Sequence, residues 1–313
     1  MEALEEGGGR LQIQNEKILA LRSNSSLTGG LVKTIIISMG IFEAIVLGIV
    51  QGLSEFLPIS SSGHLVVFQK ILTPGPHSIL FDLAVHLGTV LSILTLYRKS
   101  IQKIFSQAFK SLGTKSSSHG LQLVLFVFVA NIPTAIIGFG FKDQFEQLFS
   151  NFTAVGVCFF LTGLLLFVTR WKSKSGQMKA TQLDDLSGLE SMTYGKAIVI
   201  GIAQGLAIAP GISRSGSTIA AGILIGVEKS TAALFSFVMS IPAILGASLI
   251  ELKDFSAQDE ISLMPVISGF VAAYLSGLIG LGIVLKFVKK GRLEVFSYYL
   301  WALSLFILYK QLV

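Results

Sequence analysis

Charged residues are scarce in this sequence of 313 residues: Asp, Glu, Lys and Arg make up 13% of it, and hydrophobic residues make up 52%. Soluble domains carry about a quarter charged residues, so this composition excludes an ordinary water-soluble domain. Cys158 is the single cysteine, which excludes a disulfide framework and a cysteine-based metal site. Residues 1–38 show no charged segment followed by a clean cleavage site. We expect them to form a poorly ordered N-terminal extension.

Long apolar runs take the place of the missing charge. Six of them approach the roughly 20 residues that cross a bilayer: 79–98, 119–141, 152–170, 231–251, 262–286 and 294–312. They predict an all-α, polytopic integral membrane protein with one membrane domain, residues 39–313. The net charge of +6 lies mostly in the connections, where Lys and Arg mark the cytoplasmic side. The bilayer is therefore an expected partner, and a nucleic acid is not.

The sequence contains an internal repeat. The segment AIVLGIVQGLSEFLPISSSGHL starts at Ala44 and aligns without a gap to AIVIGIAQGLAIAPGISRSGST, which starts at Ala197. The offset is 153 residues, and 12 of the 22 positions are identical. The chain therefore divides into repeat 1, about residues 41–170, and repeat 2, about residues 194–313.

Each repeated segment has a Pro/Gly/Ser break between two apolar stretches that are too short to span a bilayer. Such stretches predict a re-entrant helix–loop–helix hairpin. Three full crossings are expected between the two hairpins, and this odd number makes them enter from opposite faces. The prediction is an inverted-topology repeat in which the breaks, 57–64 and 210–217, face each other near the midplane.

The polar residues at the breaks favour a phosphate-type site. Gln51 and Glu55 are four residues apart and share one helical face, and an intramembrane Glu needs a partner. Hydroxyls and backbone N–H groups in a Ser/Gly-rich break suit phosphate oxygens. His64 can act as an acid or base near neutral pH, and the Arg214 guanidinium can bind two phosphate oxygens at once.

Simpler interpretations exist for several of these residues. Any single serine in a membrane helix can hydrogen-bond to its own backbone. Asp82 and His86 are four residues apart, and a local pair explains them as well as catalysis does. Arg214 in a Gly/Ser break facing Glu55 is the hardest to explain without a function.

The two breaks resemble the paired motifs of one enzyme family. QGLSEFLPISSSGH matches the pattern [E/Q]xxxE with trailing serines and a histidine, and PGISRSGST matches PGxSRSxxT. Both are similar to undecaprenyl pyrophosphate phosphatases of the BacA/UppP type, the bacitracin-resistance family, and the resemblance covers about residues 40–313. It implies six transmembrane helices with two re-entrant hairpins in an inverted repeat, in agreement with the parity of the crossings.

The implied reaction converts undecaprenyl pyrophosphate to undecaprenyl phosphate and inorganic phosphate in the bacterial plasma (inner) membrane. It recycles the lipid carrier for peptidoglycan and other envelope polymers and confers bacitracin resistance. The partner is then the polyprenyl pyrophosphate lipid, and a homo-oligomer is left open.

The resemblance also implies roles for individual residues. Ser61 is similar to the nucleophile, Glu55 to the second motif carboxylate, His64 to the catalytic histidine and Arg214 to the phosphate-binding arginine. A divalent cation, Mg²⁺ or Ca²⁺, is implied at Glu55 and Gln51; because Gln51 is neutral, substrate phosphates have to supply further negative charge. The expected phosphate-binding residues are Ser60, Ser62, Gly63, Gly211, Ser213, Ser215 and Thr218.

Two choices remain open from the residues themselves. Ser61 attacks the phosphorus with His64 or Glu55 removing its proton, or water attacks directly. A transporter or flippase of a phosphorylated polyprenyl lipid is the alternative function, since inverted repeats with broken helices are typical of alternating-access proteins. Ser61 and His64 favour chemistry, because a protein that only binds lipid has little use for a base.

Overall fold

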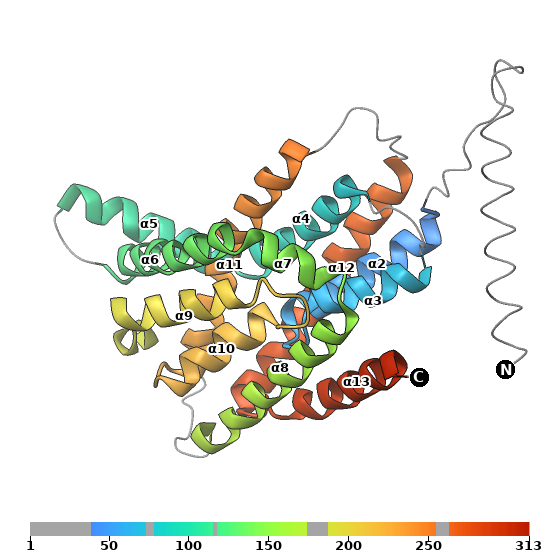
Figure 1. The fold of residues 1–313 in the computed structure, drawn as a ribbon. Coiled ribbons are helices and arrows are strands. Elements are labelled where there is room, and N and C mark those ends of the chain that lie inside the picture. The colour runs from blue at the N-terminus through green and yellow to red at the C-terminus, as the bar shows by residue number, and fades with distance from the viewer. Residues whose placement is uncertain (1–38, 73–77, 115–117, 174–186, 255–262, 313) are drawn as a thin grey trace, which may run out of the picture. The chain divides into compact units, whose positions relative to one another are not determined.

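The structure, a computed structural model, describes residues 39–72, 78–114, 118–173, 187–254 and 263–312 (Figure 1). The predicted N-terminal extension lies outside these residues. Within them the chain is helical and forms one compact unit, Met39–Val313. The α-helices are α2 (Ile41–Phe56), α3 (Ser61–Leu72), α4 (Ile79–Leu96), α5 (Arg98–Thr114), α6 (His119–Gly140), α7 (Lys142–Phe149), α8 (Phe152–Ser173), α9 (Tyr194–Leu206), α10 (Arg214–Leu224), α11 (Lys229–Glu251), α12 (Leu263–Lys290) and α13 (Val295–Leu312).

Five of these helices are long and apolar enough to cross a membrane: α4, α6, α8, α11 and α12. The chain therefore has the architecture of a polytopic membrane protein. The sixth predicted run forms α13, which has 18 residues but is not among the five. Its tyrosines and its polar last turn, with Lys310 and Gln311, lower its hydropathy. A sixth crossing stays a prediction.

The two repeated segments form two helix pairs, α2–α3 and α9–α10. Their helices have 16, 12, 13 and 11 residues, fewer than the roughly 20 needed to span a bilayer. The second helices begin at Ser61 and Arg214, two positions that the 153-residue offset relates. Both helices thus begin inside the predicted breaks, 57–64 and 210–217. They do so because the hydroxyls of Ser60 and Ser213 each accept a hydrogen bond from the backbone N–H three residues later and cap the first turn.

In each half of the chain, the first helix of the helix pair packs against a helix of the other half. The first helix of hairpin 1, α2, packs on α12 of the second half, and its counterpart α9 packs on α6 of the first half (Figure 1). Glycines of the repeated segment make both contacts close. A Cβ atom at Gly52 would overlap Ser276 and the Ala273 carbonyl, and one at Gly201 would overlap the Ala130 carbonyl. Small residues at such interfaces are typical of membrane helix packing.

We predict that Gly52→Ala and Gly201→Ala each destabilise the protein. The added methyl group has no room, and overpacking costs about 1–3 kcal/mol, which corresponds to a fall of at least about 2 °C in the thermal midpoint in detergent. Gly282→Ala in α12 is the control, because a Cβ there meets nothing within 4 Å. Equal shifts in all three variants would show that helix propensity, and not interface packing, sets the tolerance.

Candidate active site

The two breaks lie against each other. The Gly211 N–H donates to Ser60 Oγ at 3.1 Å, and Ser215 Oγ donates to the Leu57 carbonyl at 3.2 Å. These bonds join the turn between α2 and α3 to the turn between α9 and α10. The repeat therefore brings its two most polar segments into one place.

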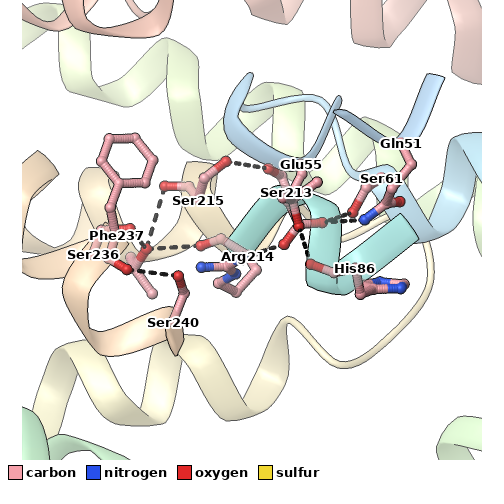
Figure 2. Close-up of polar contacts among 12 residues, drawn as sticks. Gln51, Glu55, Ser61, His86, Ser213, Arg214, Ser215, Ser236, Phe237 and Ser240 are labelled. Atoms are coloured by element: carbon pink, nitrogen blue, oxygen red, sulfur yellow. Dashed lines mark hydrogen bonds and ion pairs between the residues drawn. The ribbon is translucent and has the colours of Figure 1, made fainter. Parts of the chain in front are cut away.

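The Glu55 carboxylate lies at the centre of the contact between the two breaks (Figure 2). One carboxylate oxygen, Oε1, is paired with Arg214 Nη2. The other, Oε2, accepts hydrogen bonds from Ser61 Oγ at 2.5 Å and from Gln51 Nε2 at 3.0 Å. The Glu55 side chain is 6% exposed, so its charge depends on these partners and not on water.

Ser61 and Arg214 reach Glu55 from equivalent positions. Each is the first residue of its helix, α3 or α10, and the repeat relates the two positions. Helix N-termini carry partial positive charge and free N–H groups, which favour anions. Two of them meet at one carboxylate, and the same geometry suits the oxygens of a phosphate.

Two polar atoms of the site have no partner within the described part of the chain. Arg214 Nη1 and Gln51 Oε1 are buried and make no hydrogen bond. Such orphaned groups are costly, and they indicate what a ligand would bring. The guanidinium nitrogen needs an acceptor such as a phosphate oxygen, and the amide oxygen needs a cation or a donor.

The described residues do not form a complete metal cage. No group of three or more His, Cys, Asp or Glu side chains with suitable placement occurs among them. Glu55 and the free oxygen of Gln51 offer two oxygen ligands on one face of α2. Mg²⁺ often takes one or two protein ligands and completes its shell with water and substrate phosphates. The site therefore fits a divalent cation only together with a phosphorylated substrate.

His64 has partners other than the predicted nucleophile. Its Nδ1 lies 2.7 Å from the Ser60 carbonyl oxygen and its Nε2 lies 2.7 Å from the Tyr299 hydroxyl. The only hydrogen bond of the Ser61 hydroxyl within the described residues goes to Glu55. Of the two bases expected for Ser61, the geometry thus favours Glu55.

The serines and threonine expected to bind phosphate mostly organise the turns. Ser62 and Ser215 each lie 3.3 Å from the hydroxyl of their capping serine, Ser60 or Ser213. Thr218 is fully buried; its hydroxyl donates to the Arg214 carbonyl and lies 2.6 Å from Ser236 Oγ of α11. The structure therefore does not bring Thr218 to the carboxylate.

The two expected glycines are required by packing and by backbone conformation. A Cβ atom at Gly63 would lie 2.6 Å from the Phe159 ring and 2.9 Å from Gly211 Cα. Gly211 has a φ of 95°, which side chains disfavour. Ser60 also adopts a left-handed conformation, with a φ of 71°, at a cost of roughly 1–2 kcal/mol. Strain of this kind is typical of functional turns.

Two further residues lie near the site. His86 forms the local pair with Asp82 that the four-residue spacing allows, because its Nδ1 lies 2.7 Å from the Asp82 carbonyl oxygen. It also lies in the same region as Glu55 (Figure 2). Tyr299 contacts His64 from 235 positions away. The spacing of Asp82 and His86 was the sequence signal for their local pair, whereas a tyrosine in an apolar helix offered no signal for the contact with His64.

Comparison with known proteins gives one consistent result. The profile of the family described as bacitracin resistance protein BacA matches residues 44–306. The undecaprenyl-diphosphatase of Carboxydothermus hydrogenoformans is 44% identical over 277 residues, which cover 87% of this chain and 98% of that protein. Proteins of the same name from Halothermothrix orenii and Methanobrevibacter smithii are 40% and 38% identical, each over 86% of this chain and at least 97% of their own length.

We predict that Arg214→Lys weakens the binding of inorganic pyrophosphate about 10- to 100-fold. A lysine keeps the charge but cannot bind Glu55 and present a second donor in a fixed plane, and a charged hydrogen bond contributes about 1.5–3 kcal/mol. Calorimetry in detergent measures the affinity, with Arg98→Lys, a surface arginine, as the control. Unchanged affinity in Arg214→Lys would contradict the prediction that the guanidinium binds Glu55 and a phosphate oxygen at the same time.

Proposed function

The chain belongs to the bacitracin resistance protein BacA family, and on that premise we propose that it hydrolyses undecaprenyl pyrophosphate to undecaprenyl phosphate and inorganic phosphate. The observation that supports this most is the triad at the two breaks, in which Ser61 and Arg214 both bond to Glu55. It combines a nucleophile, a base and an anion-binding group. By recycling the lipid carrier, the reaction serves cell-envelope synthesis and bacitracin resistance.

The protein works in the bacterial plasma (inner) membrane as a multi-pass enzyme. In the proposed topology α13 is the sixth crossing, and the pairs α2–α3 and α9–α10 are re-entrant hairpins of an inverted repeat. Their shortness and the reciprocal packing of α2 on α12 and α9 on α6 support this arrangement. The prenyl chain of the substrate stays in the lipid while its pyrophosphate enters between the hairpins.

Charge complementarity holds the pyrophosphate. The free Nη1 of Arg214 and the N-terminal N–H groups of α3 and α10 face the phosphate oxygens. A divalent cation, Mg²⁺ or Ca²⁺, would be held by Glu55 and Gln51 with the substrate oxygens. When bound, such a cation neutralises charge that builds up on the transferred and leaving phosphates.

The reaction begins at the hydrogen bond between Ser61 and Glu55. Ser61 Oγ attacks the terminal phosphorus, its proton passes to Glu55 Oε2, and the bridging P–O bond breaks to release undecaprenyl phosphate. Glu55 gives the proton to the leaving oxygen. The regenerated carboxylate then takes a proton from the water that cleaves the phosphoserine and returns it to Ser61. In the alternative without a covalent intermediate, Glu55 orients the attacking water directly.

We predict that Ser61→Ala, Glu55→Gln and Arg214→Gln each lower kcat for phosphate release from a C15 or C55 prenyl pyrophosphate at least about 100-fold. Ser54→Ala is the matched control, because this serine precedes Glu55 but donates only to the Val50 carbonyl of its own helix. Full activity in Ser61→Ala alone would favour direct attack by water. A wild-type protein that binds the lipid and releases no phosphate would leave lipid transport as the function.

We also predict that the residue at position 51 sets the cation requirement. Gln51→Glu adds a second carboxylate and should lower the Mg²⁺ or Ca²⁺ concentration for half-maximal activity about tenfold, whereas Gln51→Leu should raise it by a similar factor. Activity is measured over a cation titration after removal of metal with a chelator. An unchanged half-maximal concentration in both variants would exclude this position from the cation site.

A further inference from the structure

The His64 ring is held on every side. Its two nitrogens bond to the Ser60 carbonyl and to the Tyr299 hydroxyl, each at 2.7 Å. The Tyr299 ring stacks on the imidazole at 5.8 Å between centroids and an angle of 14°, and Phe159 of α8 meets it edge-on at 5.3 Å. His64 is 5% exposed. A ring fixed in this way is suited to hold the neighbouring backbone in place and is poorly suited to transfer protons.

The bonds determine which nitrogen of His64 carries the proton. A carbonyl oxygen only accepts, so Nδ1 must be the N–H that donates to Ser60. In the neutral ring Nε2 then has a lone pair, which accepts the hydrogen of the Tyr299 hydroxyl. Both nitrogens are therefore occupied, and neither is left to take a proton from Ser61.

Ser60 is the residue that this arrangement holds. It is the one non-glycine residue with a positive φ in the described part of the chain, and it directly precedes Ser61. Its carbonyl accepts from the His64 side chain, and its hydroxyl accepts from the N–H groups of Gly63 and Gly211. Any change in the Ser60 backbone moves the Ser61 hydroxyl relative to Glu55.

We propose that Tyr299 is a positioning residue for the nucleophile. Its hydroxyl keeps His64 in the Nδ1–H tautomer, His64 holds the Ser60 carbonyl, and the left-handed turn at Ser60 aims Ser61 at Glu55. The helix α13, which packs on α8, thus acts on a hairpin to which it is distant in sequence. The proposal rests on the proposed function only through the role of Ser61.

Kinetics provide the first test. Tyr299→Phe keeps the stacked ring and removes the hydroxyl, so kcat should fall about tenfold, the loss expected for one hydrogen bond, with KM within twofold of wild type. Tyr298→Phe is the matched control: it is the adjacent tyrosine, its ring packs on Trp301, and its kcat should not change. Wild-type kcat in Tyr299→Phe, or a change in KM alone, would overturn the proposal.

A double variant tests whether Tyr299 acts through His64. If it does, His64→Ala combined with Tyr299→Phe should be no slower than His64→Ala alone, because the relay is already broken. Multiplied losses would show two independent roles and would overturn the proposal. The thermal midpoint of each variant, compared with Tyr298→Phe, separates this coupling from general unfolding.

A spectroscopic test does not require turnover. The chain has four histidines, so ¹⁵N-histidine labelling gives few ring signals, and His64→Ala identifies those of His64. Wild type should show a protonated Nδ1 and an accepting Nε2, and Tyr299→Phe should shift the Nε2 signal or populate the other tautomer. An unchanged spectrum would overturn the relay. Absence of hydrolysis by wild type would instead refute the proposed function and leave the tautomer result standing.

Discussion

The ion pair between Arg214 and Glu55 is the contact on which the rest of the structure depends. It joins the first helix of one hairpin to the second helix of the other. Removing one partner of a buried pair typically costs about 3–5 kcal/mol, because the other charge is left uncompensated. Each hairpin therefore needs the other. The glycines that let α2 and α9 approach α12 and α6 place this pair at the meeting point of two helix N-termini.

The same pair defines how a charged substrate is received. Glu55 occupies the position between two helix N-termini that an anion would favour, and both of its oxygens already accept hydrogen bonds. A pyrophosphate therefore enters beside a carboxylate and not into an empty positive pocket. The charge of the pyrophosphate is compensated by the groups that Glu55 does not bind. These are the second guanidinium nitrogen of Arg214 and the backbone N–H groups. The free oxygen of Gln51 is the group to which the proposed cation would bind.

Much of this arrangement could be predicted from the sequence, because the repeat supplied a long-range constraint. The repeat and the odd number of expected crossings predict an inverted topology in which the two breaks face each other, and an intramembrane Glu55 requires a partner there. Side-chain direction could not be predicted in the same way. Thr218 lies one turn from Arg214 but bonds to Ser236, because α11 packs against that face. Tyr299 reaches His64 only through the placement of α13, which no periodicity encodes.

The packing of helices from one half of the chain against the other half has a consequence for biogenesis. A chain that emerges from the ribosome presents Glu55 to the membrane 159 residues before Arg214 is made, and α12, on which α2 packs, comes later still. A lone carboxylate in a bilayer is costly. The first hairpin therefore reaches its final partners only after Arg214 and α12 have been made. A chain that ends before Arg214 lacks the ion pair at the site.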